Sequence, residues 1–405
     1  MKKNILLIQP ENRDINRFRR KQFNNFVQLT MPYLAAFIDE NRYEISLTDE
    51  YNQPIPYTRR FDLVAITVNT PNAPHCYRIA GRFRDGGAAV VMGGPHATLL
   101  PDEVQEHCDH LLTGECEETW PLFLQDFYLG RAQKRYVSHR PPSLNRLPHP
   151  RWDLLKARSR MMKGAVIATR GCPYHCRYCS LKQIYHDSFR TRPLEEVLRE
   201  ISLLPSRFFV FWDDNFFADR RYALSLMEKL TATGKKWAAQ VTLHSCNDAE
   251  LLRTARKSGC IYLFIGLESF SQASLESAGK TINRPDDYRE IIRLIHQNGI
   301  MVQAGIVFGF DTDTENTFDE TLHACEQLGI DGATVSILTP LPQTPVYNDF
   351  RKTGRLLDCD WSAYNGKTQV SFKPKQMTPE QLFDGYMRFR RKFYSLPSFI
   401  KRMKA

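Results

Sequence analysis

The sequence predicts an α/β protein with an N-terminal doubly wound parallel sheet, a partial barrel of six strand–helix units and a small helical C-terminal extension. Short apolar runs alternate with amphipathic helices in two separate series, and a stretch rich in prolines and basic residues interrupts them. This alternation favours parallel sheets that are covered on both faces. The 405 residues suffice for two domains. We place these at 1–130 and 161–345, with a linker at 131–160 and the extension at 346–405.

The N-terminal series contains apolar runs typical of buried strands, with helical segments among them. We expect strands at 4–10, 43–50, 62–70, 88–96 and 110–115, and helices at 33–40, 75–86 and 118–128. Sheets of this kind bind ligands at the carboxyl ends of their strands. The candidate binding residues follow those ends: Asn69, Thr70, Gly93, Gly94, Pro95, His96, Gly114 and Glu115. A lone loop histidine such as His96 is either a cofactor contact or a structural residue, and both readings remain open.

The second series begins at Gly164. We expect strands at 164–169, 208–214, 237–243, 262–268, 301–310 and 332–338, and helices at 193–204, 220–234, 248–259, 285–299 and 314–329. Six units fall short of the eight that close a full barrel, so we predict an open, partial barrel with its chemistry at the strand ends.

Composition narrows the class of protein. No apolar stretch approaches the roughly 20 residues that a membrane span requires, and the N-terminal apolar run is too short for a signal peptide. We therefore expect a cytoplasmic protein whose ten cysteines are free thiols. After Asp384 the chain carries seven basic residues, no acid and many apolar residues. This tail is either a solvated helix or a segment that contacts a membrane surface. We expect no nucleic-acid partner, because no binding motif is present.

Cys172, Cys176 and Cys179 follow the first strand of the second series within the stretch RGCPYHCRYCS. A structural zinc site and a ferredoxin-type cluster both require four ligands, and this loop supplies three cysteines. Three thiolates that held a four-iron cubane would leave one iron open to an outside ligand. The missing fourth cysteine is then the functional feature.

The spacing of these cysteines, their place in the fold and Tyr178 before the last of them resemble the radical S-adenosylmethionine (SAM) superfamily. The resemblance implies that the three cysteines hold a 4Fe–4S cluster and that SAM binds the open iron. One electron from the cluster then cleaves SAM to methionine and a 5′-deoxyadenosyl radical. The electron comes from an external reductant such as flavodoxin or ferredoxin. An electron-transfer module with no SAM chemistry is the non-enzymatic alternative.

Further segments of the second series resemble SAM contacts of the family. The resemblance implies such contacts for Tyr178, Asp213, Asp214, Asn215, Glu268, Ser269, Gly305 and Phe308. Two adjacent carboxylates at a strand end also suit the N-terminus of the next helix, so helix capping remains an alternative for Asp213 and Asp214.

The first 130 residues resemble the cobalamin-binding, Rossmann-like domain that precedes the barrel in one subgroup of the family. The chain lacks the pattern Asp-x-His-x-x-Gly, so no histidine is nominated as a lower cobalt ligand. The resemblance implies cobalamin-dependent methylation of an unactivated carbon in a small or lipophilic substrate. The alternative is radical rearrangement, cyclisation or oxidation without methyl transfer, with or without cobalamin.

Two residues past the third strand of this series are catalytic candidates. His244 suits a proton acceptor, and Cys246 suits a thiyl or methyl-accepting residue. The alternatives are a polar rim residue for His244 and a buried apolar packing residue for Cys246.

Overall fold

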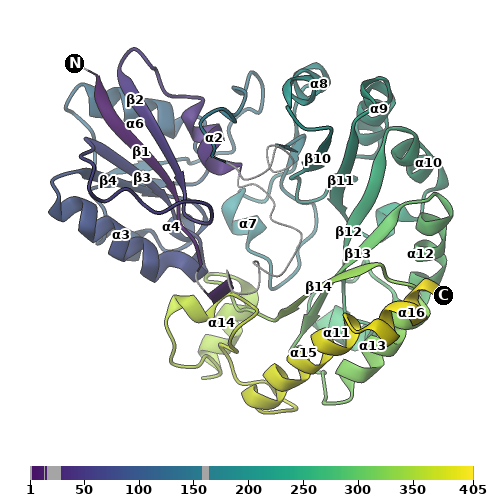
Figure 1. Cartoon of the computed structure of the whole chain (residues 1–405). Coiled ribbons are helices and arrows are strands. Elements are labelled where there is room, and N and C mark those ends of the chain that lie inside the picture. Colours follow the sequence, from purple (N-terminus) through teal and green to yellow (C-terminus); the bar gives the residue numbers. More distant parts are fainter. Residues whose placement is uncertain (1, 13, 16–28, 157–163, 405) are drawn as a thin grey trace. The chain divides into compact units, whose positions relative to one another are not determined.

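The computed structural model describes residues 2–12, 14–15, 29–156 and 164–404, so part of the predicted linker, 157–160, lies outside the described residues. The chain forms two compact units, each built from more than one stretch of sequence (Figure 1). Unit 1 contains residues 1–165, 181–188 and 359–365. Unit 2 contains residues 166–180, 189–358 and 366–405.

Unit 1 is built on a six-stranded parallel sheet. In chain order its strands are β1 (Lys3–Gln9), β2 (Tyr43–Asp49), β3 (Leu63–Thr67), β4 (Ala89–Gly93), β5 (His110–Thr113) and β6 (Arg135–Val137). Their order across the sheet is β2-β1-β3-β4-β5-β6, and every neighbouring pair is parallel. The order reverses between β1 and β3, which is the point where doubly wound sheets bind ligands. β6 lies within the segment predicted as a linker.

Side-chain alternation along these strands supplies two buried faces. Leu6, Ile66 and Met92 point to one face, where helix α3 (Ala73–Asp85) presents Ile79 and Phe83 to the same hydrophobic cluster. The spacing of the buried residues of α3 fits an amphipathic helix. On the other face, two hydrogen bonds hold helix α6 (Thr119–Tyr128) against an earlier helix and β2. Trp120 Nε1 donates to the Leu34 carbonyl at 3.0 Å, and Tyr43 Oη donates to the Leu124 carbonyl at 2.7 Å.

The remaining helices of unit 1 are short. They are α2 (Thr30–Ala35), the 3-10 turn η1 (Thr70–Asn72), α4 (Pro95–Leu99), α5 (Pro101–Gln105), α7 (Leu181–Ile184) and the 3-10 turn η6 (Trp361–Ala363). Pro95 and Pro101 each stand in the first turn of a helix, where the missing N–H carries no cost. These two short helices were absent from the prediction because they contain too few residues to show periodicity.

Unit 2 is built on a six-stranded sheet with its strands in chain order, β14-β13-β12-β11-β10-β7. Their bounds are β7 (Ala165–Val166), β10 (Phe208–Phe211), β11 (Lys236–Val241), β12 (Cys260–Glu268), β13 (Met301–Phe308) and β14 (Gly332–Ile337). The strands from β10 to β14 are parallel. The predicted first strand, 164–169, is interrupted. Its end forms β8 (Thr169–Arg170), which pairs with β9 (Arg190–Thr191) in a separate antiparallel pair.

Helices follow the strands of this sheet. They are α8 (Leu194–Leu203), α9 (Arg220–Leu230), α10 (Ala249–Lys257), α11 (Gln272–Ser277), α12 (Tyr288–Gln297) and α13 (Thr317–Gln327). Figure 1 shows α8, α9, α10 and α12 on the outer side of the curved sheet. Phe211 contacts Phe209 and Trp237 at centroid distances of 5.1 and 5.3 Å, and all three side chains are buried. The predicted α/β class is confirmed in both units.

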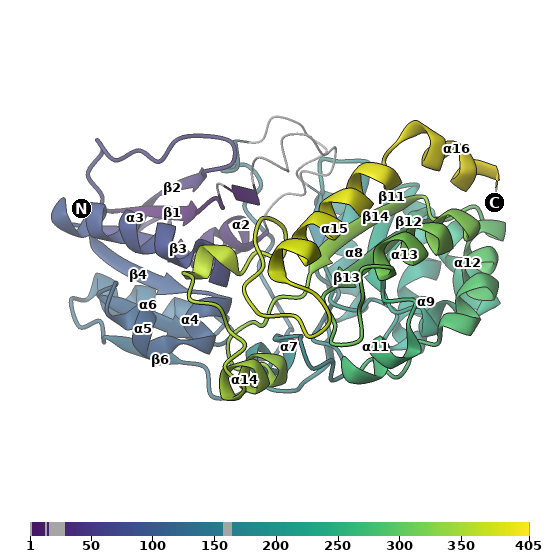
Figure 2. The ribbon, with the colours of Figure 1, turned by 90° about the horizontal axis from the view of Figure 1, so that it is seen from below.

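The end of the chain adds three helices to unit 2, α14 (Pro345–Lys352), α15 (Pro379–Phe393) and α16 (Leu396–Lys404). Thr378 caps α15, with its hydroxyl accepting from Gln381 N while the Gln381 side chain accepts from Thr378 N. The chain that runs through α15 and α16 is seen from a second direction in Figure 2. Within the described residues, no helix combines the length and the apolar character needed to cross a bilayer.

Candidate functional site

The three-cysteine loop begins directly after β8, at Gly171, whose φ of 88° is in the left-handed region. Cys172, Cys176 and Cys179 are half-buried and unbridged. Cys179 N donates to the Cys176 carbonyl at 3.0 Å, which turns the chain between these two cysteines. Burial raises the pKa of the Cys172 and Cys176 thiols, so a positive metal centre is the kind of partner that favours their thiolate forms.

Two adjacent carboxylates after β10 hold the start of this loop. Asp213 is buried and accepts from the backbone N–H groups of Ala168, at 3.1 Å, and Thr169. Asp214 accepts from Gly171 N at 3.0 Å. Burial raises the pKa of Asp213 to about 7. The capping alternative is wrong, because the N-cap of α9 is Asp219, which accepts from Tyr222 N at 3.0 Å.

Asn215 is fully buried beside Cys172. Its amide faces the Cys172 thiol, and within the described part of the chain neither polar atom of the amide makes a hydrogen bond of ordinary geometry. A buried amide without a partner costs about 1–3 kcal/mol. This orphaned group at the edge of the cysteine loop therefore fits a site that a polar ligand completes.

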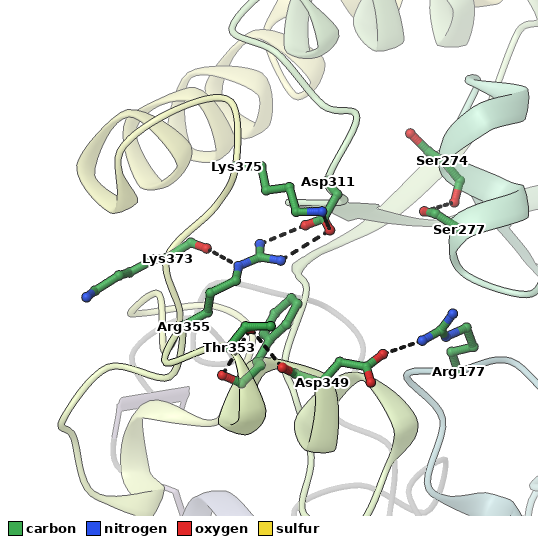
Figure 3. Close-up of polar contacts among 10 residues, drawn as sticks. Arg177, Ser274, Ser277, Asp311, Asp349, Thr353, Arg355, Lys373 and Lys375 are labelled. Atoms are coloured by element: carbon green, nitrogen blue, oxygen red, sulfur yellow. Dashed lines mark hydrogen bonds and ion pairs between the residues drawn. The ribbon is translucent and has the colours of Figure 1, made fainter.

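Two contacts from elsewhere in unit 2 fix the middle of the cysteine loop. Arg177 N donates to the Ala278 carbonyl at 2.9 Å, and Val346 N donates to the Arg177 carbonyl at 3.3 Å. The Arg177 guanidinium also pairs with Asp349 on α14 (Figure 3). The loop is thus attached to the end of α11 and the start of α14, two elements that are distant in sequence.

A buried ion pair lies at the end of β12. Lys280 Nζ contacts Glu268 Oε1 at 2.7 Å, and both side chains are about nine-tenths buried. Burial opposes the charge on Lys280, but Glu268 and Cys176 outweigh it and raise the pKa of this lysine. Glu268 has a φ of 65°, which is rare outside glycine, and it follows a register shift in the β12–β13 pairing. Tyr178 is also near Glu268, and burial with that carboxylate raises the pKa of its phenol.

The other predicted contacts on β12 and β13 are placed differently. Gly305 faces the Phe264 ring, and Ser269 is buried with its carbonyl accepting from Tyr288 Oη at 3.0 Å. Phe308 points to the opposite face of the sheet, where it packs against Phe318 and Phe389 at centroid distances of 4.7 and 5.2 Å. The sequence reasoning placed Phe308 on the cofactor side, and this is wrong because side chains alternate along a strand.

Past the end of β13, Asp311 connects the sheet to the C-terminal segment. Arg355 Nη2 contacts Asp311 Oδ1 at 2.7 Å, and Lys375 Nζ contacts Asp311 Oδ2 at 2.8 Å (Figure 3). Asp313 is buried and accepts from Gly309 N at 2.8 Å, from Phe310 N at 3.0 Å and from the Ser274 hydroxyl at 3.0 Å. The turn is therefore held by carboxylates that the sequence analysis did not single out.

The two catalytic candidates after β11 differ in exposure. Cys246 is fully buried, its thiol donates to the Thr242 carbonyl at 3.6 Å, and burial raises its pKa well above the ordinary value. His244 is exposed. The structure therefore gives Cys246 the surroundings of a packing residue, which was the alternative reading.

In unit 1 the predicted binding residues gather at the carboxyl ends of β3, β4 and β5. Asn69 N donates to Asn72 Oδ1 at 2.8 Å, and Gly94 adopts a φ of 106° before Pro95 opens α4. Gly114 N donates to Thr98 Oγ1 at 2.9 Å. Thr70 and Glu115 are buried, and Gly93 ends β4.

His96 is fully buried within a polar cluster. Its Nδ1 lies 3.2 Å from Thr70 Oγ1, and its Nε2 lies 3.5 Å from Glu103 Oε1. The same Glu103 oxygen accepts from Tyr77 Oη at 2.8 Å and from Trp361 Nε1 at 2.9 Å. Burial opposes ionisation of Glu103, but these donors outweigh it and lower the pKa of the carboxyl. The sequence reasoning missed Glu103, Tyr77 and Trp361, since no motif marks them.

Comparison with known proteins matches residues 166–325 to the radical SAM superfamily. This segment contains the cysteine loop and the strands from β10 to β13. Residues 166–325 form a radical SAM domain. This radical SAM core is the larger part of unit 2.

Relatives extend the likeness to the whole chain. Bacteriochlorophyllide d C-12(1)-methyltransferase of Chlorobaculum tepidum is 29% identical over 415 residues, which cover 100% of this chain and 90% of that protein. The anaerobic magnesium-protoporphyrin IX monomethyl ester cyclase of Cereibacter sphaeroides is 28% identical over 371 residues, which cover 82% of this chain and 60% of the cyclase.

A solved structure shares the fold. It is the radical SAM methyltransferase TsrM from Kitasatospora setae, with cobalamin and a 4Fe–4S cluster bound. The TM-score is 0.70 at 18% identity, and the likeness covers 87% of this chain and 78% of TsrM. A sheet like that of unit 1 therefore precedes a radical SAM core in a solved enzyme.

The cysteine loop of the radical SAM core supplies three thiols of the kind that hold an iron–sulfur cluster. Within the described residues, no three His, Cys, Asp or Glu side chains form a group that would hold one ion. The ligands of a cubane bind different irons, so Cys172, Cys176 and Cys179 need not converge on one point. Three half-buried thiols on one turn, with an orphaned amide beside them, match that requirement.

Proposed function

We propose that this radical SAM enzyme transfers a methyl group to an unactivated carbon of a lipophilic small molecule, with cobalamin as its second cofactor. The observation that carries the proposal is the match of the whole chain, both units included, to a methyltransferase. The fold shared with TsrM supports the choice of cobalamin. In such enzymes the cofactors carry the difficult chemistry and the protein positions them.

When bound, the cluster and SAM supply the radical and cobalamin supplies the methyl group. Cys172, Cys176 and Cys179 hold the cluster through their thiolates. Asp213 and Asp214 keep the loop in place through its backbone N–H groups, so neither carboxylate needs to touch the cluster.

The remaining polar groups near the loop are assigned to SAM. Asn215 presents a buried amide that makes no hydrogen bond of ordinary geometry in the described chain, which suits the polar methionine end of SAM. Glu268 accepts from Lys280 and also interacts with the Tyr178 phenol, and we assign this carboxylate to the ribose hydroxyls of SAM. Gly305 is not assigned to SAM, because the Phe264 ring fills the space beside it and would lie 3.1 Å from a Cβ at this position.

An exposed aromatic side chain lies at the carboxyl end of β10, next to the cysteine loop. Trp212 stands between β10 and Asp213 and is about two-fifths exposed. Aromatic faces of this kind favour conjugated ligands. The two relatives act on bacteriochlorophyllide d and on magnesium-protoporphyrin IX monomethyl ester, by their names. A cyclic tetrapyrrole is therefore the substrate class that we propose.

Unit 1 is the proposed cobalamin domain, with the cofactor at the carboxyl ends of β1, β3 and β4. His96 is engaged by Thr70 and Glu103 and is closed off from solvent. We therefore assign it to the wall of the site and not to the cobalt. An external reductant of the flavodoxin or ferredoxin class would supply the electron, and the protein would work in the cytoplasm, with contact to a membrane surface.

The test uses the full chain, reconstituted anaerobically with iron, sulfide and cobalamin. It is incubated with reductant, SAM labelled in its methyl group and bacteriochlorophyllide d as the acceptor. We expect the label to appear in the product, the protein to show the absorbance of bound corrin, and 5′-deoxyadenosine to form. Product that forms without label, or full activity in protein that lacks corrin absorbance, would sink the methyl-transfer proposal.

The second candidate is ring closure or oxidation without methyl transfer. The similarity to the cyclase favours it, because that relative matches this chain at almost the same identity as the methyltransferase. Magnesium-protoporphyrin IX monomethyl ester as the test substrate separates the two functions. Conversion of that compound with unlabelled product supports the second candidate.

A further inference from the structure

Helix α16 is fixed to unit 2 by one side only. Ser398 and Arg402 form its buried side. Arg402 Nη1 donates to the Phe393 carbonyl and to Ser398 Oγ, at 2.5 and 2.9 Å, and its guanidinium lies 3.8 Å from the centre of the Phe393 ring. These contacts set the rotation of α16 about its axis, so the direction of its opposite side is determined.

The opposite side of α16 is apolar and exposed. Leu396, Phe399, Ile400 and Met403 are 70%, 49%, 44% and 72% exposed, and their spacing places them on one stripe of the helix. Tyr394, just before the helix, is 57% exposed. These five belong to the eleven most exposed large apolar side chains of the described chain. Five exposed apolar side chains within ten residues indicate a contact surface, because exposed apolar residues on a protein surface are usually scattered singly.

Basic side chains lie in the last turns of α15 and α16. Lys392 pairs with Asp319 at 2.6 Å and Lys401 pairs with Glu326 at 2.9 Å. Arg391 and Lys404 are exposed, and no acidic partner is found for either of them in the described part of the chain. The sequence contains no acid after Asp384. The segment that carries the stripe therefore has uncompensated positive charge.

We infer that this face of α16 binds the surface of a membrane that contains anionic lipids. The apolar stripe would enter the boundary between headgroups and acyl chains, and Arg391 and Lys404 would meet the lipid phosphates. A second copy of the chain is a less suitable partner for this face, because the positive charges of the two copies would repel each other. The inference is independent of the methyl-transfer proposal, since it involves no cofactor and no strand end.

The experiment is flotation of the full chain with vesicles of phosphatidylcholine alone and with vesicles that also contain phosphatidylglycerol. The structure predicts binding to the anionic vesicles, weak binding to the neutral ones, and loss of binding as salt is raised. The double variant Phe399→Glu with Met403→Glu should lower the partition coefficient at least about tenfold, because burial of one large apolar side chain is worth about that factor.

The matched control is Leu203→Glu, which places a glutamate on a 61% exposed leucine at the end of α8. This variant should bind vesicles as the unchanged protein does. Circular dichroism of both variants checks that they fold. Absence of vesicle binding by the unchanged chain overturns the inference. The inference is also overturned if Leu203→Glu loses as much vesicle binding as the double variant does. A dimer of the unchanged protein that the double variant abolishes, and Leu203→Glu does not, would likewise overturn it.

Discussion

Trp361 donates its indole N–H to Glu103 Oε1 at 2.9 Å, across 258 residues of sequence. Its ring also contacts His96 edge to face, at a centroid distance of 5.3 Å. A segment that follows the radical SAM core thus completes the polar cluster beside the carboxyl ends of β3 and β4. The polar cluster of unit 1 therefore includes a residue that follows the radical SAM core in the sequence.

Replacement of Trp361 should weaken unit 1 in two steps. Trp361→Phe removes the donor and keeps a ring, so we expect a loss of about 1 kcal/mol. Trp361→Ala also empties the space and should cost about 3 kcal/mol. Urea unfolding measures both, and equilibrium binding of cobalamin should weaken in the same order. Unchanged unfolding of Trp361→Ala would show that the segment contributes nothing to unit 1.

Loss of one loop cysteine should abolish cluster assembly. Cys176→Ala leaves two thiolates, and we expect iron content, the visible absorbance of the cluster and formation of 5′-deoxyadenosine to fall to background. Cys359→Ala is the control, because this half-buried cysteine lies outside the loop. If Cys176→Ala still cleaves SAM reductively, the assignment of the cluster ligands is wrong.

Replacing one partner of the Glu268–Lys280 ion pair should lower the free energy of unfolding more than replacing both. Lys280→Met leaves a buried carboxylate without its partner and should cost about 3 kcal/mol of unfolding free energy. Adding Glu268→Gln should recover much of that loss. The exposed pair of Lys229 and Glu195 is the control, and its disruption should cost below about 1 kcal/mol. Additive effects of Lys280→Met and Glu268→Gln would contradict this account.

Asp313 should make unit 2 less stable as the pH rises. Burial raises its pKa from 3.8 to about 6, so the folded state holds this proton more tightly than the unfolded state does. The resulting stability is complete below the unfolded pKa and is lost as pH rises through the folded pKa. The total is about 3 kcal/mol.

The variant Asp313→Asn removes this dependence. We expect the difference in unfolding free energy between the unchanged protein and the variant to fall between pH 4 and pH 6, as the raised pKa requires, and then to level off. Asp286→Asn, at an exposed aspartate, should leave the pH profile unchanged. A difference that stays constant across this range would show that Asp313 titrates at its ordinary value.

Local signals in the sequence predicted the elements that carry the chemistry. Cys172, Cys176 and Cys179 are recognisable because their spacing and the preceding strand occur together. Both sheets follow from apolar runs whose burial is set by neighbouring strands. Phe308 shows the limit of such reasoning, because a choice between adjacent residues of a strand decides which face a side chain occupies.

Long-range contacts escaped the prediction for a different reason. Glu103 and Trp361 acquire their roles only when the folded chain brings α5 and η6 together, and neither lies in a motif. Asp214 was predicted to contact SAM, and in the structure its carboxylate accepts a hydrogen bond from the backbone of the cysteine loop. The identity of a residue near the site was therefore easier to predict than the group that it touches.

Unit 1 is assembled from three separate stretches of the chain, 1–165, 181–188 and 359–365. A chimera that exchanged only the N-terminal stretch with a relative would keep Trp361 from one parent and Glu103 from the other. Domain exchange in this family of chains must therefore move all three stretches together.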